Sequence, residues 1–286
     1  MRTYILLLVL TVIAFSSCKE NRMHEHADWS KFYEAHGIKN ACIIIRNNNH
    51  ETIDYYNKER CLQRFMPAST FKIFGSLVAL ETAAAPDEQW VIKWDSVQRR
   101  EDCNKDLSLR EAFRASCYSY FKAIANKVGE PVLQHWLDTV KYGNMELGEE
   151  FDAAWVKDGN LKISADEQLG FVKRLYFNEL PFSERSQRIV RSMMLWEDSA
   201  NYKLSYKTGT GEVGDNYIYW IVGYVERIEK VEEHEKSMNK ANFRQYPYFF
   251  AQNFEMPKSD TSKDYFKVRV EVLKEVLRAA GALPKN

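Results

Sequence analysis

The stretch Met66-Pro67-Ala68-Ser69-Thr70-Phe71-Lys72-Ile73 contains the pattern from which the rest of the chain can be interpreted. A proline and a Ser-Thr pair ahead of an apolar run predict a helix start, with Ser69 in or near the first turn. Residues three apart share a helix face, so Ser69 and Lys72 can come within hydrogen-bonding reach. Apolar neighbours would favour the neutral amine that a base must be. The pair therefore indicates a nucleophile with its base, although a Ser-x-x-Lys alone also fits an ordinary capped helix.

Length and charge limit the classes of protein that this chain can represent. The 286 residues include 40 basic and 40 acidic side chains, which balance to a formal net charge of zero. Without a basic excess to neutralise phosphates, we expect no nucleic-acid partner. No linker, internal repeat or low-complexity run divides the sequence, so we expect one globular domain over residues 29–286.

The N-terminus has the features of an export signal over residues 1–17. Met1-Arg2-Thr3 forms a charged start, and the apolar run after it is too short for a permanent membrane span. Ser16-Ser17 directly before Cys18 resembles a bacterial lipoprotein box, with Cys18 lipidated and residues 18–28 acting as a tether. Phe15 departs from the aliphatic residue usual there, so simple signal cleavage stays open. Both alternatives predict export to the periplasm, and lipidation would add membrane attachment.

Four further cysteines, Cys42, Cys61, Cys103 and Cys117, would then lie in a compartment that permits disulfides. Their spacing does not resemble a metal site, so we expect none. Cys42 and Cys61 flank a predicted hairpin and could pair. The sequence does not fix the connectivity, and four unpaired buried thiols remain an alternative.

Hydrophobic periodicity predicts strands near both chain ends and helices between them. An N-terminal hairpin over residues 41–56 precedes the Ser69 helix, and β-branched and aromatic runs follow after Lys203. This order predicts an α/β protein (α+β in terms of layers), with an antiparallel sheet built from both chain ends and the helices segregated around it. The long charged segment from Arg227 to Arg244 is interpreted as a solvated helical hairpin, with a substrate-facing role as the weaker alternative.

Two more motifs complement the Ser69 and Lys72 pair. Ser116 ends a predicted helix, and Lys207-Thr208-Gly209 lies on a predicted strand. The glycine would let a substrate backbone approach closely, and the lysine would supply a fixed positive charge. A nucleophile, a base, a second hydroxyl and a cation together indicate acyl transfer.

The ordered set of motifs resembles that of the class D, oxacillinase-type serine β-lactamases. It comprises the Ser69 motif, the Ser116 turn, Tyr142-Gly143-Asn144, Trp155 and Lys207-Thr208-Gly209. Joint occurrence in order is far more specific than any single motif. The resemblance implies a β-lactamase/transpeptidase-like fold, with a five- or six-stranded sheet beside an all-helical subdomain, and the hydrolysis of β-lactams as small-molecule substrates through an acyl-enzyme.

The same resemblance implies roles for individual residues. Ser69 would be acylated, and carbon dioxide (or bicarbonate) would carboxylate Lys72 into the general base, supported by the indole of Trp155. Ser116 would relay a proton to the lactam nitrogen. The backbone N–H groups of Ser69 and Thr210 would form the oxyanion hole.

Substrate binding is implied for Lys207, Thr208, Gly209 and Arg269, although an exposed helix arginine is the plain alternative for Arg269. Two positions depart from the family. Tyr118 stands where a valine usually packs over the modified lysine, so its phenol could support or crowd a carbamate, and Thr210 replaces an aromatic residue.

Two other functions share most of these motifs. A penicillin-binding transpeptidase has the Ser-x-x-Lys and Lys-Thr-Gly patterns, but the Trp155 loop argues against it. A β-lactam sensor domain would be acylated without efficient turnover. Sensors of that kind follow several membrane helices, whereas this chain has a single short export signal.

Overall fold

We describe the fold from a computed structural model, which describes residues 22–156, 160–231 and 243–284. Cys18, the predicted lipidation site, therefore lies outside the described residues. Within these ranges, no helix combines the length and the apolar character needed to cross a membrane.

A seven-stranded sheet forms the centre of the described chain, in the order β1-β3-β2-β9-β8-β7-β6. The N-terminal strands β2 and β3 join the C-terminal strands through an antiparallel β2–β9 pairing, as predicted from the order of elements. The sheet has more strands than the five or six expected, and β1 pairs in parallel with β3. The strand bounds are β1 Met23–Glu25, β2 Asn40–Asn47, β3 Thr52–Tyr56, β6 Leu195–Asp198, β7 Tyr202–Val213, β8 Asn216–Lys230 and β9 Phe243–Pro257. Because β1 belongs to the sheet, the folded unit begins before residue 29.

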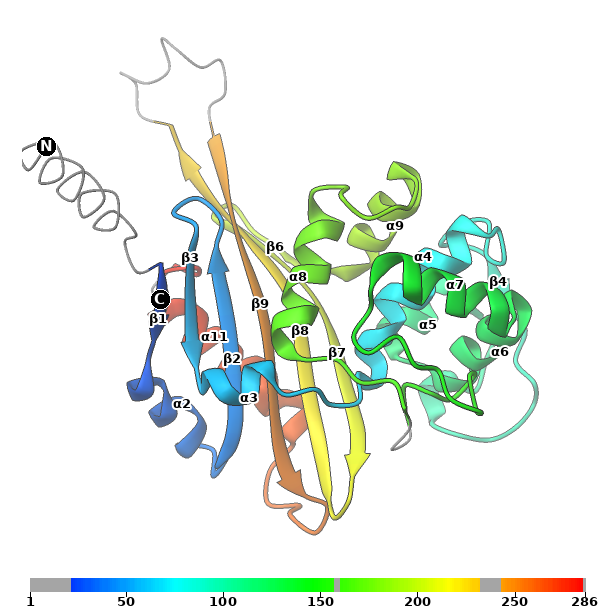
Figure 1. Ribbon diagram of the computed structural model, residues 1–286, viewed down its shortest axis with the longest axis horizontal. Helices are drawn as coiled ribbons and strands as arrows, with labels where there is room; N and C mark the ends of the chain where they lie inside the picture. Colours follow the sequence, from blue (N-terminus) through cyan, green and yellow to red (C-terminus); the bar gives the residue numbers. More distant parts are fainter. Residues whose placement is uncertain (1–21, 157–159, 232–242, 285–286) are drawn as a thin grey trace, which may run out of the picture.

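Helices cover both faces of this sheet (Figure 1). On one face lie α2 (Ser30–Glu34) and α11 (Tyr265–Ala279), and on the other α3 (Lys58–Leu62), α8 (Ala165–Tyr176) and α9 (Glu184–Met194). Side chains alternate between two cores along the strands: Ile43 of β2 joins the α11 core, whereas its neighbour Ile44 joins the core on the opposite face.

The helical subdomain lies beside the sheet and next to β7 (Figure 1). Its helices are α4 (Lys72–Glu81), α5 (Leu109–Ala115), α6 (Tyr118–Val128) and α7 (Glu130–Val140), with the 3-10 turns η2 (Ala68–Phe71) and η3 (Glu101–Cys103). A short ladder of β4 (Val91–Ile92) and β5 (Leu107–Ser108) completes it, and η1 (Ala27–Trp29) leads into α2. A capping box formed by Ser164 and Glu167 begins α8.

Two expectations are wrong. The segment from Arg227 to Arg244 is not helical where it is described, because β8 continues to Lys230 and pairs there with Phe243 of β9. Alternation of aromatic and charged residues supports strand pairing there in spite of the high charge. Residues 232–242 lie outside the described residues.

The suggested pairing of Cys42 with Cys61 is also wrong. The disulfide joins Cys103 to Cys117, and the other two cysteines are buried and free. Cys42 lies on β2. Cys61 lies on α3, and its thiol donates to the carbonyl of Tyr56. The disulfide instead fastens the η3 loop to the residue that follows Ser116.

Candidate active site

Ser69 lies in the 3-10 turn η2, which leads directly into α4. The hydroxyl and the N–H of Thr70 both donate to the Pro67 carbonyl, at 2.6 and 3.2 Å. Gln168 of α8, fully buried, donates to the Thr70 hydroxyl at 2.6 Å. Bonds from within the turn and from α8 therefore hold the backbone on both sides of Ser69.

Gly209 of β7 packs against the same turn. A Cβ at this position would lie 3.1 Å from three backbone atoms, the Pro67 oxygen and the nitrogens of Ser69 and Thr70. We expected the glycine to admit a substrate backbone. In the structure, the Ser69 turn itself is what requires a residue without a side chain.

Lys72 is completely buried, and its Nζ donates to the Ser69 Oγ at 2.8 Å. The amine lies 5.2 Å from the centroid of the Phe121 ring. Burial, with a smaller contribution from the charge of Arg100, lowers the pKa of Lys72 to about 7. Near neutral pH, much of this lysine is therefore a neutral amine in contact with the Ser69 hydroxyl.

Trp155 covers the apolar surroundings of this lysine. Its ring stacks on Phe71, with the centroids 4.5 Å apart, and lies 6.2 Å from the ring of Tyr118. The indole Nε1 is buried and has no hydrogen-bond partner in the part of the chain that the structure describes. A buried donor without an acceptor is costly, so this N–H is available to an acceptor that enters the site.

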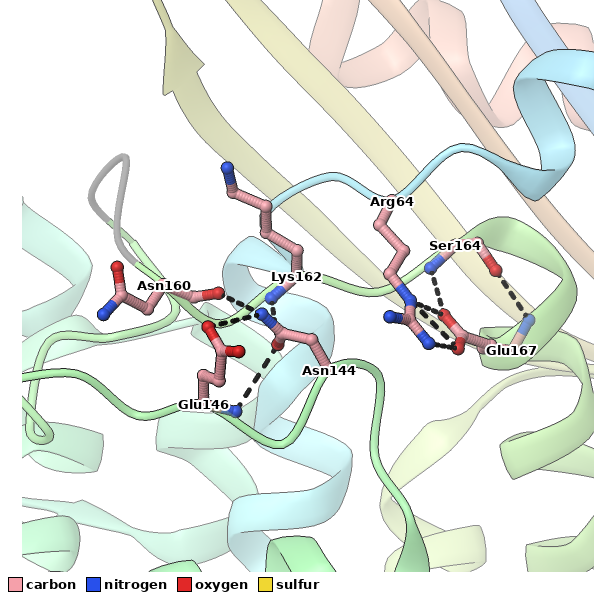
Figure 2. A network of polar contacts seen from close by, with 7 residues as sticks. All are labelled: Arg64, Asn144, Glu146, Asn160, Lys162, Ser164 and Glu167. Carbon is pink, nitrogen blue, oxygen red and sulfur yellow. Dashed lines mark hydrogen bonds and ion pairs between the residues drawn. The ribbon is translucent and has the colours of Figure 1, made fainter.

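The Tyr142-Gly143-Asn144 motif closes the loop that carries Trp155 (Figure 2). The side chain of Asn144 accepts from the Lys162 N–H at 2.9 Å and donates to the Asn160 carbonyl at 2.5 Å. Gly143 has a positive φ, and a Cβ there would lie 2.1 Å from the Lys162 carbonyl. One asparagine and one glycine thus join the two ends of the loop.

Ser116 and Lys207 form a second polar pair. Ser116 ends α5 in the left-handed conformation, with φ at 57°, and its Oγ accepts from the Lys207 Nζ. The same amine donates to the Thr208 carbonyl at 2.9 Å. Burial and the charges of Lys72, Arg269 and Arg100 hold the pKa of Lys207 well below its usual range. The bond to the Ser116 hydroxyl places Lys207 for proton transfer through that serine.

Arg269 is buried, with 7% of its surface exposed, so the alternative of an exposed helix arginine is excluded. Its Nη1 donates to the Gly209 carbonyl at 3.0 Å and to the Thr210 hydroxyl at 2.9 Å. Burial lowers the pKa of Arg269 to about 10, which leaves it charged near neutral pH. Among the described residues it has no carboxylate partner. A buried cation without one favours an anion from a ligand.

These groups meet at one cavity of about 400 Å³. It is lined by residues from η2, the η3 region, α5, α6, β7 and α11, namely Ser69, Arg100, Arg114, Ala115, Ser116, Tyr118, Val156, Thr208, Gly209, Thr210, Phe266 and Arg269. β6 pairs with β7 only as far as Ser205. Residues 208–210 of β7 therefore lie at a sheet edge that no described strand covers. Lys72 and Lys207 lie behind the wall, bonded to the two lining serines. In the described ranges, no group of three or more His, Cys, Asp or Glu side chains could hold a metal ion.

Sequence reasoning missed five residues of this cavity, Arg100, Arg114, Ala115, Val156 and Phe266. None lies in a motif, and isolated arginines give no signal of their own. The spacing of Cys103 and Cys117 was the available clue, because a bond between them brings the η3 loop to Ser116.

Comparison with known proteins identifies the family. Residues 37–231 match the model of the penicillin-binding protein transpeptidase domain. The chain is 33% identical to β-lactamase OXA-20 of Pseudomonas aeruginosa over 98% of its own length and 97% of the relative's. It is also 33% identical to β-lactamase OXA-48 of Klebsiella pneumoniae, over 97% and 96% of the two chains.

The chain belongs to the class D β-lactamases. Solved structures agree with this assignment and with the predicted fold. A class D β-lactamase from Nostoc superposes with a TM-score of 0.78 at 34% identity, covering 89% of this chain and 99% of the other. The class D β-lactamase from Sebaldella termitidis superposes with a TM-score of 0.80 at 30% identity, covering 93% of this chain and 100% of the other. The predicted resemblance to serine β-lactamases is confirmed.

Proposed function

We propose that this protein hydrolyses β-lactam antibiotics through an acyl-enzyme on Ser69, with the side chain of Lys72 as the base. The observation that carries the proposal is the 2.8 Å contact between the Ser69 Oγ and a completely buried lysine whose pKa falls to about 7. A neutral amine accepts a proton, whereas an ammonium cannot. Membership of the class D β-lactamases supports the same reaction.

In the acylation step, the Ser69 Oγ attacks the lactam carbonyl carbon while its proton leaves toward the Lys72 side chain. The carbonyl oxygen becomes an oxyanion, which the N–H groups of Ser69 and Thr210 would stabilise. Collapse of this intermediate breaks the lactam C–N bond. The released nitrogen takes a proton from Ser116, and Lys207 resupplies Ser116 through the bond between them.

The Lys72 pocket fits a carbamate formed from carbon dioxide. Only a neutral amine reacts with carbon dioxide, and burial gives Lys72 that form. The indole N–H of Trp155, buried without an acceptor, would donate to the added carboxylate. When bound, this group would supply a carboxylate-type general base for acylation and for the activation of water in deacylation.

Arg269, Thr208 and Gly209 would hold the carboxylate that β-lactams carry beside the lactam ring. Arg269 is charged, buried and bonded to Thr210 and the Gly209 carbonyl. A charge-assisted bond to a substrate carboxylate would fix the lactam over Ser69. No metal takes part in this scheme.

The experiment that tests the proposal measures benzylpenicillin hydrolysis with and without added bicarbonate. We expect turnover by the natural protein, recovery of activity lost at acid pH when bicarbonate is added, and no effect of bicarbonate on Lys72→Met. A stable adduct on Ser69 without release of product would contradict hydrolysis and favour a sensor-like protein.

Tyr118 gives this test a second variant. It lines the cavity and lies beside Trp155, so its phenol could occupy the space that a carbamate needs. If it does, Tyr118→Val raises both the rate and the response to bicarbonate. If the carbamate forms beside the phenol, the same substitution leaves the response to bicarbonate unchanged.

We further propose that the chain is exported and tethered to the bacterial membrane by a lipid on Cys18. The proposal depends on the charged start, the short apolar run and the Ser16-Ser17-Cys18 sequence. Cys18→Ser should release protein from the membrane fraction into the soluble periplasmic fraction. Natural protein found in the soluble fraction would contradict the tether.

A further inference from the structure

The active-site cavity carries more positive charge than one substrate carboxylate requires. Its lining includes three arginines, Arg100, Arg114 and Arg269, and no aspartate or glutamate. The sequence as a whole is neutral, so this local excess does not follow from composition. Arg269, on α11 behind β7, suffices for the carboxylate of the fused ring system.

The two remaining arginines lie on the helical side of the cavity, next to the Ser116 turn. Arg114 is in the last turn of α5, where it donates to the Leu195 carbonyl and lies 4.9 Å from the ring centroid of Trp196. Its protein contacts are with a carbonyl and a ring, and none of the described carboxylates forms an ion pair with it. Its charge is therefore uncompensated.

Arg100 reaches the same turn from the η3 loop. It donates to the Ala115 carbonyl and lies 3.4 Å from the Sγ of Cys103, while its Nε pairs with Asp102, a residue outside the cavity lining. The disulfide from Cys103 to Cys117 fixes this loop to the residue after Ser116. Both arginines are thus held in place, and neither is used by the proposed reaction.

From this arrangement we propose that Arg100 and Arg114 form a second anion subsite, which selects β-lactams whose acyl side chain carries a carboxylate. In such compounds the side chain and the ring carboxylate extend from opposite sides of the lactam. Arg269 on the sheet side and the arginine pair on the helical side therefore match two anions in one substrate. The inference rests on the proposed attack by Ser69, because that attack fixes the orientation of the lactam.

A structural role is the competing explanation, because both arginines donate to backbone carbonyls. Arg114 also lies in the last turn of α5, where the helix dipole favours a positive charge. The two explanations differ in what they predict for matched substrates. Loss of a structural contact slows acylation by every β-lactam equally. Loss of a subsite slows acylation chiefly by the substrate with the second carboxylate.

The test compares benzylpenicillin with α-carboxybenzylpenicillin, which differ by one carboxylate. Acylation rates are measured by competition with a fluorescent penicillin for the natural protein, Arg100→Gln, Arg114→Gln and the double variant. We expect the ratio of the two rates to fall about tenfold in the double variant, the size of one charge-assisted hydrogen bond that is partly exposed to solvent. Arg100→Lys should recover part of the ratio, because it keeps the charge.

Arg99→Gln is the matched control, because Arg99 pairs with Asp95 and is absent from the cavity lining. It should leave the ratio unchanged. A ratio that is unchanged in the double variant, or equal slowing by both penicillins, would overturn the subsite. If the natural protein is acylated but releases no product, the proposed hydrolysis fails, while the acylation ratio still decides the subsite.

Discussion

The two walls of the cavity are built in different ways. The Ser69 turn is buried, packed against β7 and α8, and held by short bonds among uncharged groups. The Ser116 wall is linked by a disulfide and by arginines at its rim, and the side chain of Arg100 is 55% exposed. Burial lowers the pKa of Lys72 on the first wall, whereas the second wall presents the guanidinium groups of Arg100 and Arg114 to the cavity. We infer that the first wall supplies the nucleophile and its base, and that the arginines at the rim of the second wall select substrates.

Removal of the buried amine should separate activity from stability on the first wall. We expect Lys72→Met to lower kcat for benzylpenicillin about a thousandfold or more, because general base catalysis is lost. The free energy of unfolding should stay the same or rise, because a buried polar group is replaced by an apolar one of similar volume. Kinetics and urea unfolding check the two expectations. A large loss of stability would contradict the inference that Lys72 serves the reaction alone.

The close contact between Gly209 and the Ser69 turn gives the next largest effect. Gly209→Ala should cost about 1–3 kcal/mol of unfolding free energy and reduce kcat/KM about 10- to 100-fold, because the new methyl displaces the turn. Gly170→Ala is the control, since Gly170 lies in α8 with nothing within 4 Å of a new Cβ. It should stabilise the protein by about 0.5–1 kcal/mol. Equal effects of the two substitutions would contradict the account.

Acid pH should inactivate the enzyme through the first wall. The pKa of Lys72 is lowered to about 7, so the neutral amine predominates above pH 7 and the ammonium below it. We expect kcat/KM to fall about tenfold per pH unit below that value, with added bicarbonate opposing the fall. A pH profile that stays flat from pH 8 to pH 5 would show that Lys72 is not the base.

The disulfide tests the second wall, with a smaller expected effect on activity. Replacement of Cys103 and Cys117 by serine should lower the free energy of unfolding by up to about 3 kcal/mol, from the loss of a loop constraint of this length. Benzylpenicillin hydrolysis should fall only a few-fold, because the Ser69 wall is unaffected. A reducing agent should lower the free energy of unfolding of the natural protein and leave that of the double variant unchanged. A loss of activity as large as that of Lys72→Met would remove the distinction between the walls.

Ser69, Lys72 and Ser116 could be predicted from the sequence, whereas the arginines of the second wall could not. Ser69 and Lys72 are three residues apart on one helix, so local geometry brings them together whatever the rest of the chain does. The burial of Lys72 also follows from its apolar neighbours. Lys207 was placed correctly on a strand, but its lowered pKa depends on burial and on three other cations, both of which tertiary structure produces.

The errors have the same origin. Cys103 and Cys117 pair because a loop folds back onto the end of α5, and no local pattern encodes that contact. Arg100 reaches the cavity through the same loop, whereas Arg114 lies on α5 itself. The high charge after Arg227 led to the prediction of a helical hairpin. In the described part of this segment, β8 and β9 instead stay paired as far as Lys230 and Phe243, in spite of the charged side chains. The fold class, by contrast, followed from the order of strands and helices.

Time-resolved mass spectrometry of the protein with benzylpenicillin tests the central claim most directly. We expect an adduct that maps to Ser69, that appears while substrate remains and disappears once it is consumed, and that is absent from Ser69→Ala. In Lys72→Met, the adduct should form slowly and persist. An adduct on any other residue would contradict the assignment of the nucleophile. Rapid formation and release in Lys72→Met would contradict the role of the buried lysine.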